Sequence, residues 1–127
     1  KTFAAYCYSA HGENHWMRMS AQRFREVDER EVEEFISSPE WVDMFAHVKR
    51  SFAGPFGLGL KVVAPEAGFT WPEEDFDGEE SVNARREALA GDFVARQRLL
   101  DYNSGDVQAT RAVREWMDAG APGTTAL

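Results

Sequence analysis

The sequence predicts a helix-rich α/β domain with a small partial sheet. Residues 2–8 are a continuous run of mostly apolar and aromatic side chains, which is typical of a buried strand. Much of the remaining chain carries apolar residues at intervals of three and four, the spacing of amphipathic helices. With 127 residues, 43% of them hydrophobic, and with nine Phe and four Trp, the chain is long enough for one domain and apolar enough for a core. This composition excludes wholesale disorder.

The first half of the chain is predicted to continue with helices and one ambiguous segment. After a turn at residues 9–12, residues 13–24 carry apolar side chains at helical spacing, and residues 28–37 form a short acidic helix. Ser38-Pro39 then suits a helix start, with Ser at the N-cap and Pro at the first helical position. Residues 41–44 suit a second strand equally well, and the pattern does not separate the two interpretations.

The second half is predicted to be helical, with one long acidic loop at residues 69–80. Asp75-x-Asp77-Gly78 in this loop lacks the further ligands of a calcium loop, so a plain solvated loop is expected. The helices are expected over residues 60–67 (where Val62-Val63 also suits a strand), 81–89 and 92–102, with a further helix that ends near Met117. The domain is thus predicted over residues 1–119, with a flexible tail at residues 120–127.

The charge of the chain limits its partners. Acidic residues outnumber basic ones by 22 to 14, which gives a formal net charge of −8. A domain that holds nucleic acid by bulk attraction is normally basic, so contact with nucleic acid calls for a bound divalent cation to offset this charge. No stretch approaches the roughly 20 apolar residues of a membrane-spanning helix, so no membrane partner is predicted.

The single cysteine, Cys7, indicates the compartment. One cysteine forms no internal disulfide, so nothing points to an oxidising environment, and a cytoplasmic location is predicted. Because Cys7 lies in the opening apolar run, it is expected to be a small buried side chain rather than a reactive thiol. No signal peptide is visible. The chain also lacks an initiator Met and opens on a strand, so it is expected to be a piece of a longer protein.

Asp106 is the most informative acidic residue. The last predicted helix has an apolar stripe, and counting back from Ala109 by threes and fours reaches Asp106 and then Tyr102. A carboxylate on an inward face is costly unless it is paired, hydrogen-bonded or bound to metal. The alternative is that Asn103 is an N-cap and Asp106 the third-position acid of a capping arrangement. The pattern leaves both interpretations open.

Glu13 is the second candidate, because it follows the opening strand where α/β folds place ligand groups. As an acid in the first turn of a helix it would also complement the helix dipole, which is the ordinary explanation. His11 is expected in the turn before this helix, so that it need not share a face with His15, and a zinc site is not predicted. There is no G-x-S-x-G motif, and Cys7 has no evident base partner.

Several segments resemble one known family. The run Leu99-Leu-Asp-Tyr-Asn-Ser-Gly-Asp106-Val-Gln-Ala-Thr110 resembles the C-terminal signature of the predicted RecB-family nucleases that carry a YprB-type RNase H-like domain. Gly68-Phe-Thr-Trp71 and Gly59-Leu-Lys-Val-Val-Ala-Pro65 are similar to other segments of that family. Tyr6-Cys-Tyr-Ser-Ala-His-Gly-Glu13 is similar to the strand-to-helix segment with its second acidic motif. The resemblance covers nearly the whole chain.

The resemblance implies a metal-dependent nuclease of the DEDD 3′–5′ exonuclease type, acting on phosphodiester bonds of DNA or RNA. In such enzymes four carboxylates hold two divalent cations, Mg²⁺ or Mn²⁺. Asp106 matches the last of these acids and Glu13 the third. Tyr102, four residues before Asp106, matches the residue that orients the attacking water. By this resemblance the three residues are the catalytic candidates, and the two acids are the metal ligands.

The chain departs from the family pattern at its beginning. The first motif, an Asp-x-Glu pair on an opening strand, has no counterpart, so the chain resembles the C-terminal part of an RNase H-like domain. The upstream part of the parent protein is then a required partner, and this chain alone is expected to be inactive. A partial sheet also leaves an open edge for self-association.

The rival hypothesis is a non-catalytic nucleic-acid-binding or scaffold module. In that case the acidic residues are helix caps and solvated faces, and Lys61, Arg111 and Arg114 contact phosphate. Strong salt dependence without dependence on divalent ions would favour this rival.

Overall fold

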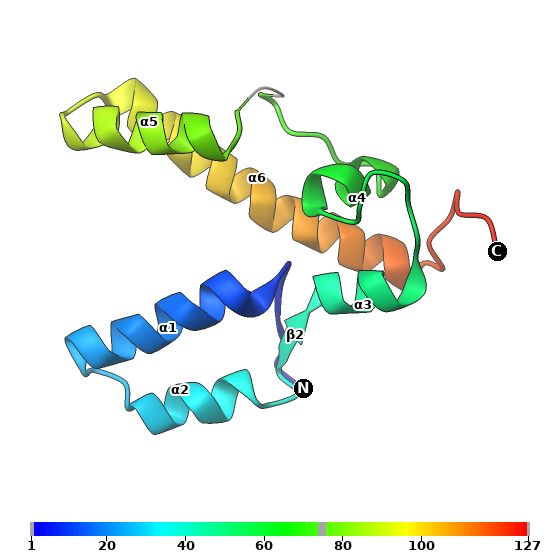
Figure 1. Cartoon of the computed structure of the whole chain (residues 1–127), viewed down its shortest axis with the longest axis horizontal. Coiled ribbons are helices and arrows are strands. Elements are labelled where there is room, and N and C mark those ends of the chain that lie inside the picture. The colour runs from blue at the N-terminus through cyan, green and yellow to red at the C-terminus, as the bar shows by residue number, and fades with distance from the viewer. Residues whose placement is uncertain (1, 74–75, 127) are drawn as a thin grey trace. The chain divides into compact units, whose positions relative to one another are not determined.

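The computed structural model describes residues 2–73 and 76–126, and the chain divides into two compact units (Figure 1). Unit 1 comprises Lys1–Val62 and unit 2 comprises Val63–Leu127. The predicted helix-rich α/β class with a small partial sheet is confirmed. Among the described residues, no helix is long and apolar enough to cross a membrane.

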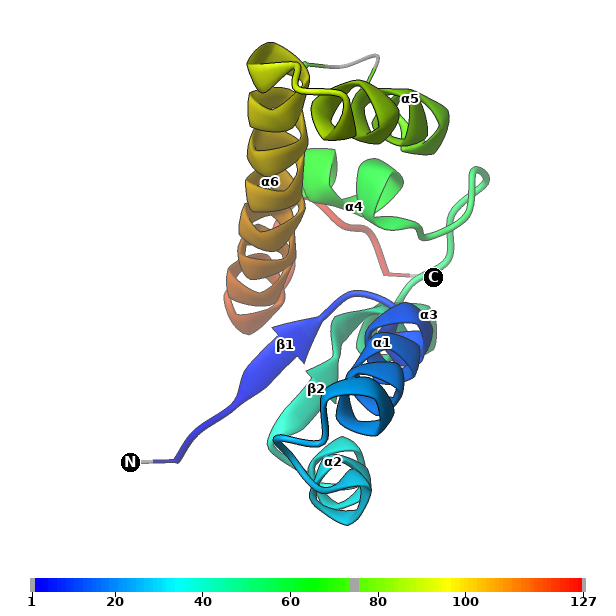
Figure 2. The same ribbon diagram turned by 90° about the vertical axis from the view of Figure 1, so that its left-hand side faces the viewer.

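The sheet of unit 1 consists, in the described part of the chain, of two parallel strands (Figure 2). They are β1 (Ala5–Cys7) and β2 (Trp41–Asp43), with Ala5 opposite Trp41 and Cys7 opposite Asp43. The strand interpretation of residues 41–44 is therefore the right one, although β2 stops at Asp43. The opening strand is shorter than predicted, and within β1 only Cys7 is buried. The carboxyl ends of both strands lie at the same edge because the strands are parallel.

Helices α1 (Ala10–Phe24) and α2 (Glu29–Ile36) connect β1 to β2, and α3 (Met44–Ser51) follows β2 directly. The acidic helix α2 is confirmed, and Asp28 closes its start in a capping box with Glu31. The expected turn at residues 9–12 is wrong, because α1 begins at Ala10, directly after Ser9, whose φ is 73°. His11 thus lies inside α1, one helical turn from His15, and not in a turn before it.

Unit 2 is built around one long helix. Helix α4 (Leu60–Glu66) spans the boundary between the units, and α5 (Gly78–Leu89) packs along α6 (Phe93–Asp118). The core between α5 and α6 contains the buried side chains of Phe76, Ala84 and Ala95. Asp75, part of the motif compared above with a calcium loop, lies outside the described residues. Its neighbour Asp77 is the N-cap of α5.

The two predicted helices after Asp92 are a single helix, so the expected break near Tyr102 is wrong. Asp92 caps the start of α6, and the backbone hydrogen bonds of this helix continue without a break through Asn103 and Gly105. Asn and Gly are weak helix formers, but strong helix formers on both sides and the packing of Trp71 at Gly105 stabilise a continuous helix. Asn103 is therefore no N-cap, and the interpretation of Asp106 as an acid in a capping arrangement is excluded.

After α6 the chain turns back onto the helix. The indole Nε1–H of Trp116 donates a hydrogen bond to the carbonyl oxygen of Pro122 at 3.0 Å. Ala121 is buried, although its φ of 49° is unusual for a residue with a side chain. The first residues beyond α6 thus contact its last turns.

Candidate functional site

Asp106 lies in the middle of α6, half-buried, and an indole holds its carboxylate. The Nε1–H of Trp71 donates a hydrogen bond to Asp106 Oδ1 at 2.9 Å. Trp71 is itself buried, with 8% of its surface exposed. The backbone carbonyl of Asp106 accepts a hydrogen bond from the hydroxyl of Thr110, one turn later, at 3.0 Å. The carboxylate on an inward face is thus hydrogen-bonded, as its burial requires.

Tyr102 lies one helical turn before Asp106 and on the same face of α6. Its ring packs edge-on against Phe76, with the ring centroids 4.9 Å apart. Burial of the hydroxyl, together with the nearby charges of Asp106 and Asp77, raises the pKa of Tyr102 above its ordinary value. The phenol is therefore protonated at neutral pH and able to donate a hydrogen bond, and it is a poor base.

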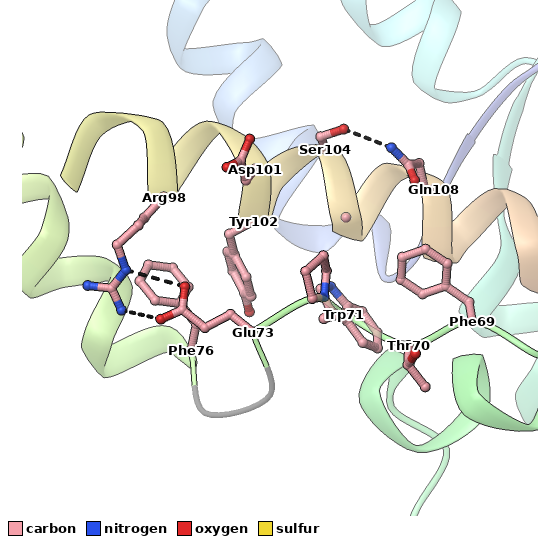
Figure 3. Close-up of a pocket in the computed structure, with 12 residues that line it drawn as sticks. Phe69, Thr70, Trp71, Glu73, Phe76, Arg98, Asp101, Tyr102, Ser104 and Gln108 are labelled. Atoms are coloured by element: carbon pink, nitrogen blue, oxygen red, sulfur yellow. Dashed lines mark hydrogen bonds and ion pairs between the residues drawn. The ribbon is translucent and has the colours of Figure 1, made fainter. Parts of the chain in front are cut away.

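A cavity of about 370 Å³ lies beside Tyr102, between α6 and the segment that follows α4 (Figure 3). Tyr102 points from α6 toward this segment, which carries Trp71 and Glu73. Arg98 forms an ion pair with Glu73, and its guanidinium lies over the ring of Phe76 at 4.7 Å from the centroid. The cavity therefore has aromatic walls and a paired, rather than a bare, positive charge.

Glu13 lies in unit 1, exposed in the first turn of α1 and just beyond the carboxyl end of β1. Burial first, and then the charges of Asp43 and Glu13, raise the pKa of the Cys7 thiol to about 12. Cys7 is thus a protonated, buried thiol at neutral pH. Asp43 lies opposite Cys7 at the end of β2, and Glu13 lies in the first turn of the helix that follows β1.

A second indole fixes the helix that carries Glu13. The Nε1–H of Trp41, on β2, donates a hydrogen bond to Asn14 Oδ1 at 2.8 Å. The ring of Trp41 also packs on Phe35 of α2, with the centroids 5.5 Å apart. Because Asn14 directly follows Glu13, this contact sets the rotation of α1 about its axis and hence the direction in which Glu13 points.

Asp43 is a residue that the sequence analysis missed. Its carboxylate accepts hydrogen bonds from the backbone N–H groups of Ser9 and Ala10, at 2.9 and 3.1 Å, and of Phe45 at 3.0 Å. One side chain therefore caps the starts of both α1 and α3. An Asp between a strand and an apolar helix is a recognised N-cap signal. That signal identifies the cap of α3, but not the contact with α1, which depends on strand pairing.

Replacing Asp43 with Ala is expected to lower the free energy of unfolding by about 2 kcal/mol at pH 7, since two helix starts lose their cap. Burial alone would raise the pKa of Asp43, but hydrogen bonds from Ala10, Ser9, Phe45 and Ala46 outweigh it, and its pKa lies below the ordinary value. The stabilisation is therefore present above about pH 4 and lost as pH falls through the lowered pKa. Urea unfolding at pH 7 and pH 2.5 measures it.

The difference between wild type and Asp43→Ala should shrink at pH 2.5, while Asp28→Ala, which removes the cap of a single helix, should cost less at pH 7. An equal loss at both pH values would contradict the role assigned to the ionised carboxylate.

The three basic residues predicted to contact phosphate differ in their surroundings. Lys61 is exposed on α4. Arg111 pairs with Glu115 at 2.8 Å, and the half-buried Arg114 lies 3.8 Å from the same carboxylate. A phosphate group near the two arginines would therefore compete with Glu115, and the structure adds no support for a dedicated phosphate site there.

The carboxylates of Asp106 and Glu13 have the oxygen chemistry that Mg²⁺ and Mn²⁺ prefer. Among residues 2–73 and 76–126, no three His, Cys, Asp or Glu side chains are grouped so that they hold a metal ion. His11 and His15 lie one turn apart, but no third His, Cys, Asp or Glu among the described residues joins them as a metal ligand. Asp106 and Glu13 also belong to different units.

Comparison with known proteins gives one family. The model of the RNase H superfamily matches residues 5–118, which is most of the chain and includes Glu13, Tyr102 and Asp106. No curated protein and no solved structure matches the chain. The match agrees with the RNase H-like fold expected from the resemblance described above.

Proposed function

The chain belongs to the RNase H superfamily, and on this premise we propose that it is part of a metal-dependent nuclease that cleaves phosphodiester bonds in DNA or RNA in the 3′–5′ direction. Within the superfamily we place it with the RecB-family nucleases of YprB type. The superfamily match supports a nuclease-type function and a nucleic acid substrate. The finer assignment rests on the sequence resemblance and on the geometry of α6.

The observation that carries the proposal is the pair Tyr102 and Asp106. They lie one turn apart on the same face of α6, and the Asp106 carboxylate is held by a hydrogen bond from Trp71. The Tyr102 hydroxyl, whose pKa lies above its ordinary value, is protonated at neutral pH. A fixed carboxylate and a neutral phenol are the two groups that the family places at this spacing, as ligand and as water-orienting donor.

The chain contributes part of the ligand set. We propose Asp106 and Glu13 as two of the acidic ligands, with the others supplied by the parent protein. Divalent cations held by such carboxylates stabilise the charge that develops on the phosphodiester oxygens. They also offset the net charge of −8, which would otherwise repel a polyanion. The residues of this chain then serve to hold the ligand oxygens and to orient a water molecule.

The test is a cleavage assay with end-labelled single-stranded DNA and RNA, using the protein at its natural length. Cleavage is expected with Mg²⁺ or Mn²⁺ and none with EDTA, while the 127-residue chain alone should bind divalent ions weakly and cleave poorly. Binding that weakens steeply with salt, without any divalent-dependent cleavage, would favour the non-catalytic nucleic-acid-binding module instead. Rapid cleavage by the 127-residue chain alone, lost in Asp106→Asn, would show that its ligand set is complete.

Replacing Tyr102 with Phe is expected to slow single-turnover cleavage by on the order of 100-fold, because a poorly placed nucleophile is costly. The ring and its packing on Phe76 remain, so stability should fall by only about 1 kcal/mol, the worth of one hydrogen bond. Melting temperature and cleavage rate are measured on the same preparations, with Tyr6→Phe on β1 as the matched control. A large fall in melting temperature with unchanged cleavage per folded molecule would make Tyr102 a core residue only.

A further inference from the structure

Trp71 is the residue that, we propose, positions the Asp106 carboxylate and thereby strengthens divalent-cation binding by it. This inference rests on the proposed function and deepens it, since it concerns a residue for which the sequence resemblance gives no role. Trp71 is a positioning residue and not a ligand, because an indole Nε1–H only donates hydrogen bonds.

The contact between Trp71 and α6 is closer than a side chain at position 105 would allow. A Cβ built on Gly105 would lie 2.8 Å from Trp71 Cδ1, a distance that real Cβ atoms essentially never show, and a tight 3.1 Å from Nε1. Glycine inside a helix costs about 1 kcal/mol relative to alanine. Here its absent side chain lets the indole lie against the helix backbone, so that Nε1–H reaches Oδ1 of the next residue, Asp106.

The indole is itself held in place by the segment before it. The N–H of Gly68 donates to the carbonyl of Pro65 at 3.0 Å, and the N–H of Phe69 donates to the carbonyl of Ala64 at 2.9 Å, which closes α4. Phe69 then packs edge-on against Trp71, with the ring centroids 5.1 Å apart (Figure 3). The indole that donates is thus held by the closed end of α4 and by the ring of Phe69.

A fixed donor matters because a carboxylate that binds a cation must present its oxygens in one direction. Rotation about the Asp106 side-chain bonds would spread those oxygens over several orientations. A hydrogen bond to Oδ1 limits this rotation before any ion arrives. Groups that orient a metal ligand in this way typically change metal affinity by roughly 10- to 100-fold when removed. An ionised carboxylate has two oxygens with about four lone-pair sites, so accepting an indole hydrogen and binding a cation are compatible.

The experiment measures Mn²⁺ affinity of the protein at its natural length for wild type, Trp71→Phe and Asp106→Asn. We expect Trp71→Phe to raise the Mn²⁺ dissociation constant roughly 10- to 100-fold, and Asp106→Asn to raise it further. Trp116→Phe is the matched control, because its indole donates to the backbone carbonyl of Pro122 and not to a carboxylate. Its Mn²⁺ affinity should equal that of the wild type. Equal affinity in Trp71→Phe and wild type would overturn the inference.

A second measurement leaves the indole in place and so does not depend on the folding of Trp71→Phe. In ¹⁵N-labelled protein the indole N–H resonance of Trp71 should move upfield in Asp106→Asn, where a carboxylate acceptor becomes a weaker amide. The resonances of Trp41 and Trp116 should stay in place. An unmoved Trp71 resonance would show that the contact with Asp106 does not form in solution, and the inference would fall.

The two proposals fail in distinguishable ways. If wild type and Asp106→Asn bind Mn²⁺ equally, Asp106 is not a ligand, and the proposed function falls together with the role of Trp71. If Asp106→Asn loses affinity while Trp71→Phe keeps it, the proposed function stands and the role of Trp71 alone is refuted.

Discussion

Asp106→Asn is expected to reduce divalent-dependent cleavage by the natural-length protein by on the order of 1000-fold or more, with little change in stability. The amide keeps the size of the carboxyl group and one oxygen that accepts the Trp71 hydrogen bond, so the local fold is retained. What is lost is the negative charge that attracts a hard cation. Replacing a residue that only orients a metal ligand typically lowers metal affinity or activity by roughly 10- to 100-fold, so replacing the ligand itself should lower activity further.

The matched control is Asp118→Asn, which removes the same charge from the exposed end of the same helix. Single-turnover rates, circular dichroism and melting temperature are recorded for both variants. Asp118→Asn should cleave at the wild-type rate. If both variants cleave at that rate, Asp106 contributes nothing to the chemistry, and its contact with Trp71 is structural.

Phe76→Ala is expected to lower the free energy of unfolding by about 3 to 5 kcal/mol, the usual effect of replacing a buried aromatic side chain with alanine. Phe76 is 1% exposed and belongs to the core between α5 and α6. Its ring also supports the ring of Tyr102 and lies beneath the guanidinium of Arg98. The cavity left behind would therefore weaken unit 2 and free Tyr102 to change its orientation.

Urea unfolding monitored by circular dichroism measures this loss, and Phe93→Ala provides the comparison. Phe93 is 83% exposed at the start of α6, so its removal should change stability by about 0.5 kcal/mol or less. Similar losses in the two variants would mean that Phe76 does not anchor the core of unit 2.

Most of the element types follow from local sequence patterns. The capping box of α2 and the apolar spacing of the long helices are signals within a few residues of each other, which is why they are readable. The start of α1 was misplaced because Gly12 and His11 suggest a turn. The break expected near Tyr102 was wrong because Asn103 and Gly105 have low helix propensity, and a contact with Trp71 outweighs it.

The candidate site was predictable only in part, for the same reason. The common face of Tyr102 and Asp106 follows from their spacing, and the superfamily match includes both. The donor that holds Asp106 lies 35 residues away in the chain. Gly105, directly before the inward-facing Asp106, indicates that another group packs closely against the helix at this point, but the sequence does not identify that group as Trp71. The second contact of Asp43, with the start of α1, likewise requires the register of two strands.

The double cap made by Asp43 also has a consequence for how unit 1 opens. Because one carboxylate accepts N–H groups from the starts of α1 and α3, neither first turn can unravel without disturbing the hydrogen bonds of the other. Local openings of this kind set the rate at which backbone amides exchange with deuterium. The amides of Ser9, Ala10 and Phe45, far apart in sequence, should therefore exchange as one cooperative group rather than fraying independently as ordinary helix ends do.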